Sequence, residues 1–275
     1  MPSRIEVFAR LNYFIFCTLA IAFCSNVAAS TAPTIRIAII IDDIGNNLPL
    51  GRRAALLPGA ITYAVLPHTP QSARLAEQAM FDNPAKEIVV HMPMQAETGN
   101  RLGPGGLEAS FQREEFLETV RSALQAVPGA RGLSNHMGSY LTTLPDRMHW
   151  LMGELKSSGY YYVDSKTSTR STARQAALDQ RVPFIERDVF LDHDRNPAAI
   201  EAAFDRALRL ASRDGLAVVI AHPYRNTLDF LEKRLPQLAA EGISLVNAST
   251  ALALENENPI LALGKRNGEA EIQVE

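Results

Sequence analysis

Cysteine is almost absent from this chain. Only Cys17 and Cys24 occur among its 275 residues, and both lie before residue 30. We expect residues 1–29 to be removed during export, which would leave the mature protein without a thiol. That excludes a disulfide framework, and it also excludes thiolate metal ligands and thiolate nucleophiles.

A strong excess of charge of either sign is also missing. The formal net charge is −3, and a nucleic-acid partner would call for a basic face, so no such partner is expected. The 47% hydrophobic and 21% charged residues are ordinary globular composition. The length allows one large domain, which we place at residues 34–254, and we interpret residues 255–275 as a polar, mobile tail.

The chain lacks an apolar run long enough for a comfortable membrane span. The run Leu11–Phe23 falls short of one, Arg4 and Arg10 flank its start, and the small residues at positions 27–29 follow it. This order is typical of a secretory signal peptide over residues 1–29. The sequence therefore predicts an exported protein of the periplasm or cell envelope. An uncleaved N-terminal anchor is the alternative, and it would be the chain's contact with a membrane.

Two adjacent carboxylates follow the most apolar strand-like run of the chain. Residues 35–41 are nearly all β-branched and show no polar alternation, as in a strand buried on both faces. Asp42 and Asp43 come next, and Gly45 lets the chain turn. Two carboxylates at a buried strand end are costly unless compensated, and a divalent cation is the usual solution. The alternative is an Asx-turn followed by a helix N-cap.

Other strand-like runs also end in residues that can bind a metal or a substrate. These endings are Val89-Val90-His91, Leu133-Ser134-Asn135-His136, Tyr162-Val163-Asp164 and Val219-Ile220-Ala221-His222. Several buried strands that each end in a polar residue indicate a functional site at one edge of a sheet.

Strands alternate with helices at a steady spacing, which predicts a single α/β domain with parallel strands. The expected strands cover residues 35–41, 61–66, 86–90, 132–134, 160–163, 182–185, 216–221 and 243–246. Since the polar residues follow the strands, as in (β/α) barrels, we expect a TIM-like barrel that is distorted or incomplete. A doubly wound open sheet is less favoured, because no Gly-rich phosphate fingerprint follows the first strand.

Taken together, these motifs resemble the divergent polysaccharide deacetylases of the carbohydrate esterase superfamily. The resemblance runs from Ile35 to about Ala251 and rests on the order and spacing of the motifs Asp42-Asp43, His91-Met92-Pro93-Met94, Gly103-Pro104-Gly105-Gly106, Ser134 to Ser139, Asp164-Ser165-Lys166-Thr167, Arg187-Asp188 and Ala221-His222-Pro223. It implies a distorted barrel and a divalent metal, usually zinc, that activates water to remove N-acetyl groups from a polysaccharide or peptidoglycan-like glycan.

The resemblance also implies roles for individual residues. Asp42 matches the general base and Asp43 the metal-binding carboxylate, while His222 matches the acid that protonates the leaving amine and Asp188 the carboxylate that orients it. The superfamily binds its metal with two His four residues apart. Here Tyr140 follows His136 at that distance, so we infer that His91 supplies the second imidazole, giving Asp43, His91 and His136 as ligands with an open position.

A further group of polar residues is assigned to substrate binding: His68, Asn135, Ser139, Asp164, Lys166 and Arg187. Of these, Arg187 or Lys166 could also hold the carboxylate of the general base Asp42 in its ionised form.

Each assignment has a structural alternative. His222 precedes Pro223 and could be a hydrogen-bonded strand-end His, and the neighbours Met92 and Met94 make the surroundings of His91 look like core. The missing second His of the motif leaves open a catalytically degenerate glycan-binding or scaffold protein. An amidohydrolase or metallophosphatase on the same fold is a third hypothesis, since both use metal-activated water.

Overall fold

The computed structural model describes residues 35–257. The expected signal peptide at residues 1–29 and residues 258–275 of the expected tail therefore lie outside the described part. Residues 35–257 belong to one compact unit. No helix in this range is long and apolar enough to cross a membrane.

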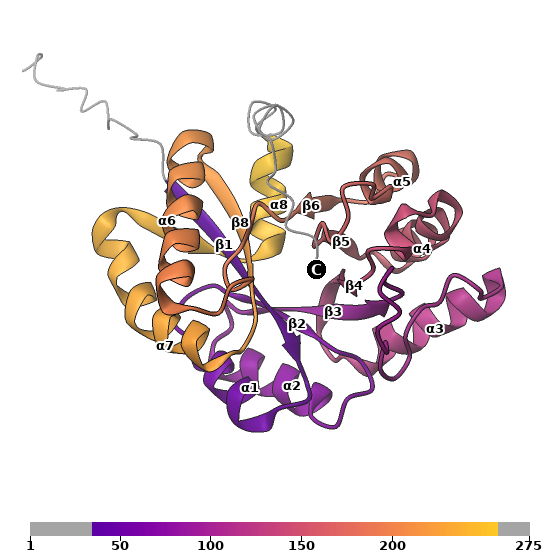
Figure 1. Cartoon of the computed structure of the whole chain (residues 1–275), viewed down its shortest axis with the longest axis horizontal. Helices are drawn as coiled ribbons and strands as arrows, with labels where there is room; N and C mark the ends of the chain where they lie inside the picture. The colour runs from indigo at the N-terminus through magenta and orange to yellow at the C-terminus, as the bar shows by residue number, and fades with distance from the viewer. Residues whose placement is uncertain (1–34, 258–275) are drawn as a thin grey trace, which may run out of the picture. The chain divides into compact units, whose positions relative to one another are not determined.

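Nine parallel strands form one curled sheet, visible at the centre of Figure 1. Their order is β6-β5-β4-β3-β2-β1-β8-β7, and β9 also pairs with β1. β9 pairs with residues 35–38 of β1, and β2 pairs with residues 40–44, so these two strands share one side of β1. The strands are β1 (Ile35–Ile44), β2 (Thr62–Val65), β3 (Glu87–Met94), β4 (Ala130–Met137), β5 (Tyr161–Asp164), β6 (Phe184–Glu186), β7 (Val189–Phe190), β8 (Leu216–Ala221) and β9 (Ile243–Val246).

Seven helices follow the strands and pack on the outer face of the sheet (Figure 1). Asn47 and Asn196 cap α1 and α6, because each side-chain oxygen accepts a hydrogen bond from a backbone N–H in the first turn. The helices are α1 (Leu48–Ala55), α2 (Ser72–Asp82), α3 (Arg113–Ala126), α4 (Pro145–Ser158), α5 (Ala173–Gln180), α6 (Pro197–Asp214) and α7 (Arg225–Arg234), with 3-10 turns η1 (Leu141–Thr143) and η2 (Leu235–Glu241).

Alternate residues of β1 face two different cores. Ile39 and Ile41 belong to the large cluster between the sheet and the outer helices. Ala38 and Ile40 belong to a smaller cluster on the inner face of the curled sheet. Burial on both faces explains why this strand shows no polar alternation. The same alternation turns Asp42 toward the inner face, at the carboxyl end of β1.

An eighth helix, α8 (Ala248–Glu257), packs on the inner face of the sheet. It contacts β1, β6 and β8, and Ala248, Ala251 and Leu252 belong to the inner cluster (Figure 1). Two buried side chains satisfy N–H groups of its first turn: Thr62 Oγ1 accepts from Ala248 N at 2.8 Å, and Glu87 Oε1 accepts from Ser249 N at 3.0 Å. The barrel therefore holds α8 through hydrogen bonds as well as apolar contacts.

Replacing Thr62 by Val is expected to lower the free energy of unfolding by about 1–3 kcal/mol, because a buried hydrogen bond is lost while the shape is kept. Thr62 Oγ1 also donates to Glu87 Oε1 at 3.3 Å, so two contacts disappear. Thr119 is the matched control, since its hydroxyl donates to Glu115 O on the surface of α3. Urea unfolding should show a loss for T62V and little change for T119V; equal stabilities would contradict this anchoring of α8.

The predicted α/β single domain with an incomplete TIM-like barrel is confirmed. The strand path begins at β6 and ends at β7, and α8 contacts β6 and β8 near the two ends of that path. β7 and α8 were not predicted. α8 reaches Glu257, so residues 255–257 are helical rather than part of a tail, and β1, β3 and β4 end at residues 44, 94 and 137, later than expected.

Candidate metal centre and active site

Three side chains, from β1, β3 and β4, converge at the carboxyl edge of the sheet. Asp43 Oδ1 of β1 lies 2.9 Å from His136 Nδ1 of β4 and 3.4 Å from His91 Nε2 of β3. All three atoms lie within 4.8 Å of one another. Because the strands are parallel, their carboxyl ends meet at one edge, and residues far apart in sequence form one cluster.

The backbone at Asp43 lets both carboxylates face this cluster. Strict alternation would turn Asp42 and Asp43 to opposite sides of the strand. Asp43 instead has φ 58°, in the left-handed region that Asp tolerates better than most residues, and the β1–β2 register shifts between Ile41 and Ile44. As a result Asp43 lies on the same side as Asp42, whose Oδ2 is 3.5 Å from His91 Nε2. The sequence had correctly placed both carboxylates at the strand end.

The donor set fits a divalent transition metal. Asp43 Oδ1 is buried and accepts no hydrogen bond of adequate geometry, although His136 Nδ1 lies 2.9 Å away. These atoms therefore point toward a common point rather than toward each other. Ligands bound about 2.0–2.1 Å from one tetrahedral zinc ion lie roughly 3.3 Å apart, close to the separations seen here. Two imidazoles and one carboxylate leave one tetrahedral position for water or substrate.

His91 is held in the form that a metal needs. Burial lowers its pKa to about 4, in spite of the opposing effect of Asp43, so the imidazole is neutral at pH 7. Its Nδ1 lies 2.7 Å from Ser134 Oγ on β4. When Nδ1 carries the proton and donates to Ser134, the Nε2 lone pair is free to face Asp43.

Replacing Ser134 by Ala is expected to weaken zinc binding by about ten- to a hundredfold, the usual effect of losing a partner that orients a ligating His. Ser134 is fully buried and contacts His91 Nδ1, the ring nitrogen that does not face the metal position. Competition titration with a zinc chelator gives the affinity. Ser168, a buried Ser on the β5–α5 loop, is the control, and equal affinities for S134A and S168A would contradict the role of Ser134.

Charge keeps Asp43 ionised. Burial alone would raise its pKa, but the nearby imidazoles of His136 and His91 outweigh burial and hold the pKa well below its usual range. Asp42 is buried as well, with 2% of its surface exposed. Asp43 thus supplies one of the three donor atoms, and Asp42 lies beside them.

His222, the residue directly after β8, is held by hydrogen bonds and by ring contacts. Its Nδ1 lies 2.9 Å from Asp192 Oδ1, and its backbone N–H donates to Asp192 Oδ2 at 2.7 Å. Thr227 Oγ1 donates to the same oxygen. The imidazole ring is stacked between Phe190 and Tyr224. Burial alone would lower the pKa of His222, but Asp192 and the more distant Asp43 and Asp42 raise it to about 9.

The assignment of Asp188 as the partner of His222 is wrong. Asp188 Oδ2 accepts from the backbone N–H of Val218, in the middle of β8. Its backbone N–H donates to Val218 O, so Asp188 joins the chain to β8 before the short strand β7 begins. Asp192 lies beyond β7, at the carboxyl edge of the sheet, and therefore reaches His222.

Asn135 and Asp164 are not brought into the cluster. Both have the strand parity of outward-facing neighbours, since Leu133 and Tyr162 lie in the outer core. Asn135 Oδ1 accepts from Tyr162 Oη and from the backbone N–H of Ser165. Asp164 accepts from Lys166 N and Ser171 Oγ. These contacts hold both side chains against neighbouring loops, and their assignment to substrate binding stays a prediction.

The remaining substrate-binding candidates lie around the edge of the sheet, and their roles stay predictions. Ser139 Oγ accepts from the backbone N–H of Glu97, and Lys166 Nζ lies 3.7 Å from Glu186. Arg187 is buried and donates to the carbonyls of Ser165 and Lys166. His68 lies on the surface with its Nε2 3.3 Å from Ser122 Oγ of α3, away from the metal cluster.

Asp192 and Ser134 were missed by the sequence analysis. The apolar residues 189–191 before Asp192 carry the signal of a short strand, but two residues of β7 are too few for a periodic pattern. Ser134 shares the inward parity of His136, which would have placed it next to the ligand strand β3.

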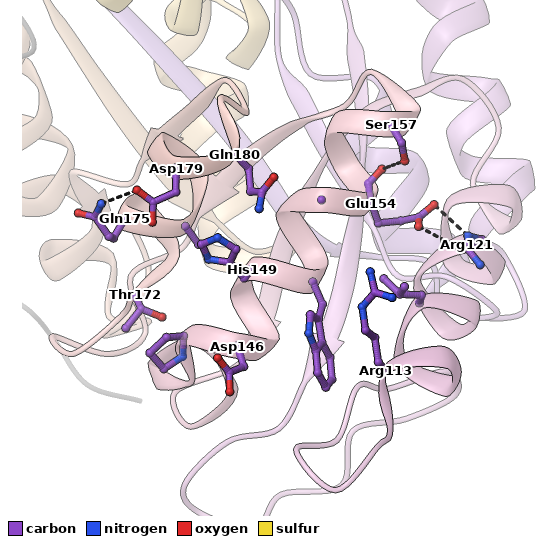
Figure 2. A pocket seen from close by; sticks show the side chains of 15 residues that line it. Arg113, Arg121, Asp146, His149, Glu154, Ser157, Thr172, Gln175, Asp179 and Gln180 are labelled. Atoms are coloured by element: carbon purple, nitrogen blue, oxygen red, sulfur yellow. Dashed lines mark hydrogen bonds and ion pairs between the residues drawn. The ribbon is translucent and has the colours of Figure 1, made fainter.

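A cavity of about 890 Å³ lies elsewhere, between the outer helices α3, α4 and α5 (Figure 2). Trp150 and His149 line it, and ion pairing between Arg121 and Glu154 closes one side. None of the metal-cluster residues is part of its lining. The cavity therefore contributes nothing to the geometry at the sheet edge.

Comparison with known sequences identifies the family. The sequence model of the family described as divergent polysaccharide deacetylase matches residues 39–252. The chain belongs to this family. The resemblance recognised in the motifs is thereby confirmed.

Two bacterial proteins are similar to this chain in sequence. The protein YibQ of Escherichia coli is 35% identical over 217 residues, which cover 79% of this chain and 67% of YibQ. A protein of Haemophilus influenzae is 32% identical over 211 residues, which cover 77% of this chain and 74% of that protein.

Solved structures share the fold of this deacetylase family member. An uncharacterized protein from Agrobacterium tumefaciens matches with a TM-score of 0.76 at 21% identity, covering 81% of this chain and 91% of that one. A mutant of the peptidoglycan deacetylase PdaC from Bacillus subtilis matches with a TM-score of 0.50 at 16% identity, covering 86% and 99%. At these identities the likeness concerns the fold alone.

Proposed function

We propose that this protein is a metal-dependent hydrolase that removes N-acetyl groups from a polysaccharide. The observation that carries the proposal is the convergence of Asp43, His91 and His136 beside Asp42 and His222. Membership of a deacetylase family supports the reaction class. We further propose zinc as the metal, since two imidazoles and a carboxylate with an open position are the ligand set of many catalytic zinc sites.

A zinc ion held by these residues would lower the pKa of a bound water from about 15.7 to about 7 and polarise the acetyl carbonyl. Asp42 lies beside the ligands and accepts the proton that the attacking water releases. The buried position of Asp42 excludes bulk water from this proton transfer.

His222 supplies the second proton. Asp192 accepts the hydrogen bond of Nδ1–H, so Nε2–H is the proton available to the departing amine nitrogen. With a pKa of about 9, the imidazolium is the main form at neutral pH. The leaving group then departs as a neutral amine rather than as an amide anion.

We propose the envelope as the place of action. The signal-peptide pattern at residues 1–29 predicts export, and an exported deacetylase meets N-acetylated envelope or extracellular glycans. An uncleaved N-terminus would hold the same active site at a membrane instead of releasing it.

Acetate release from N-acetylated glycans tests the proposal. Wild-type protein loaded with zinc should release acetate, and Asp42→Asn, which keeps the shape but removes the base, should abolish most of it. Equal acetate release by the two proteins on every glycan tested would rule out the assigned mechanism.

The same assay separates the alternative of a glycan-binding protein without activity. The replacement of the second motif His by Tyr140 motivates that alternative. Glycan binding that survives metal removal, together with no acetate release by the zinc-loaded protein, would favour it over the hydrolase.

A further inference from the structure

Four pairwise contacts link five flat groups beside the site. The ring of His222 stacks on those of Phe190 and Tyr224, with ring centroids 6.1 and 5.3 Å away and ring planes within 25° of parallel. The guanidinium of Arg187 lies 3.7 Å from the Phe190 centroid, and that of Arg195 lies 3.7 Å from the Tyr224 centroid. A cation thus lies over each of the two aromatic rings that stack on His222.

The two guanidinium groups are used differently. Arg187 is buried and donates to the carbonyls of Ser165 and Lys166, so its role is internal. Arg195 is exposed on the loop between β7 and α6, and within residues 35–257 it forms no ion pair. Contact with Tyr224 restricts the orientation of its planar group, while the residue as a whole stays exposed.

The negative charge around the site suggests a role for the exposed guanidinium of Arg195. Three carboxylates surround the reacting position: Asp42 and Asp43 at the end of β1, and Asp192 beneath His222. An anionic group on a substrate would be repelled by them unless a cation lay on its path. Arg195 offers such a cation one aromatic ring away from the acid His222.

We propose that Arg195 binds a carboxylate carried by the substrate, on the N-acetyl sugar or on the sugar next to it, and so selects acidic N-acetylated glycans. The planar guanidinium can hold a carboxylate with two parallel hydrogen bonds. This inference rests on the proposed function for the sugar class, but it concerns binding and requires no turnover.

The test compares two probes that differ in one charge: N-acetylmuramic acid, which carries a carboxylate, and its methyl ester. Ligand-detected NMR titration of the full chain gives both dissociation constants. We expect the wild-type protein to bind the acid about tenfold more tightly than the ester, the effect of one charge-assisted contact at an exposed site. Arg195→Gln should bring this ratio close to one.

Two further variants control for charge and for structure. Arg209→Gln removes an exposed Arg from the outer helix α6 and should keep the wild-type ratio. Arg195→Lys keeps the charge without the planar fork and should give an intermediate ratio.

Several outcomes would overturn the assignment: a wild-type ratio near one, an unchanged ratio in R195Q, or no binding of either probe. If Arg195 only positioned His222 through Tyr224, both probes would lose affinity equally and the ratio would stay constant. A selective ratio without acetate release in the deacetylase assay would reject the proposed reaction while keeping the carboxylate site.

Discussion

Replacing His136 by Ala is expected to lower zinc affinity by at least about a hundredfold and to abolish acetate release. Only Asp43 and His91 would remain as protein ligands, and two ligands do not complete a catalytic zinc site. His91→Ala should have the same effect, because its Nε2 faces the same carboxylate oxygen. Isothermal titration of zinc into the metal-free proteins measures the affinity.

His149→Ala is the matched control for these variants. His149 is exposed on α4 and lines the outer cavity, so its loss removes an imidazole without touching the cluster. This variant should bind zinc as the wild-type protein does. Retention of tight zinc binding by H136A or H91A would show that the metal, if bound, is held elsewhere.

Replacing His222 by Gln is expected to lower kcat by about 10²–10⁴-fold, the usual contribution of a positioned general acid. The direction of the pH dependence follows from the raised pKa. His222 must be protonated to act as the acid, and its pKa of about 9 keeps it so through neutral pH. Activity of the wild-type protein should therefore fall as the pH rises through about 9.

Asp192→Asn should shift this fall of activity at alkaline pH, the alkaline limb of the pH–activity profile, to lower pH. The carboxylate is what raises the pKa of His222 above its ordinary value of 6.5, and an amide carries no charge to stabilise the imidazolium. Asp194→Asn, on the same loop but exposed, should leave the limb near pH 9. An alkaline limb at the same pH in wild type and D192N would contradict the pairing of Asp192 with His222.

The fold was predictable where single strands carry a clear signal. The apolar run Leu216–Ala221 follows Gly215, a left-handed helix cap, and β8 has the expected bounds. β9 also has the expected bounds. β7 could not be found, because two residues show no period. α8 could not be found either, because its polar sequence Glu255-Asn256-Glu257 looks like a tail while its inner face packs inside the barrel.

The metal cluster was predictable because it depends on topology. Once the strands are parallel, the polar residues near the carboxyl ends of β1, β3 and β4 must meet at one edge. The details depend on geometry that the sequence does not reveal. A left-handed Asp43 brings the second carboxylate inward, and the choice between Asp188 and Asp192 depends on where a two-residue strand begins.

Strand parity explains why Asn135 and Asp164 lie outside the cluster. Asn135 stands next to the ligand His136, yet it faces the opposite side of β4 and braces the loop after β5. Asp164 ends β5 with the same outward parity. A polar residue at a strand end is therefore a candidate for the site only when its parity agrees with that of the ligands.

X-ray absorption spectroscopy of the zinc-loaded protein tests the central claim most directly. The account predicts about one zinc per chain, with nitrogen and oxygen donors about 2.0–2.1 Å from the metal and scattering from two imidazole rings. The imidazole signal should fall in both H91A and H136A. A protein that retains no zinc, or zinc whose spectrum lacks imidazole scattering, would contradict a metal centre built from Asp43, His91 and His136.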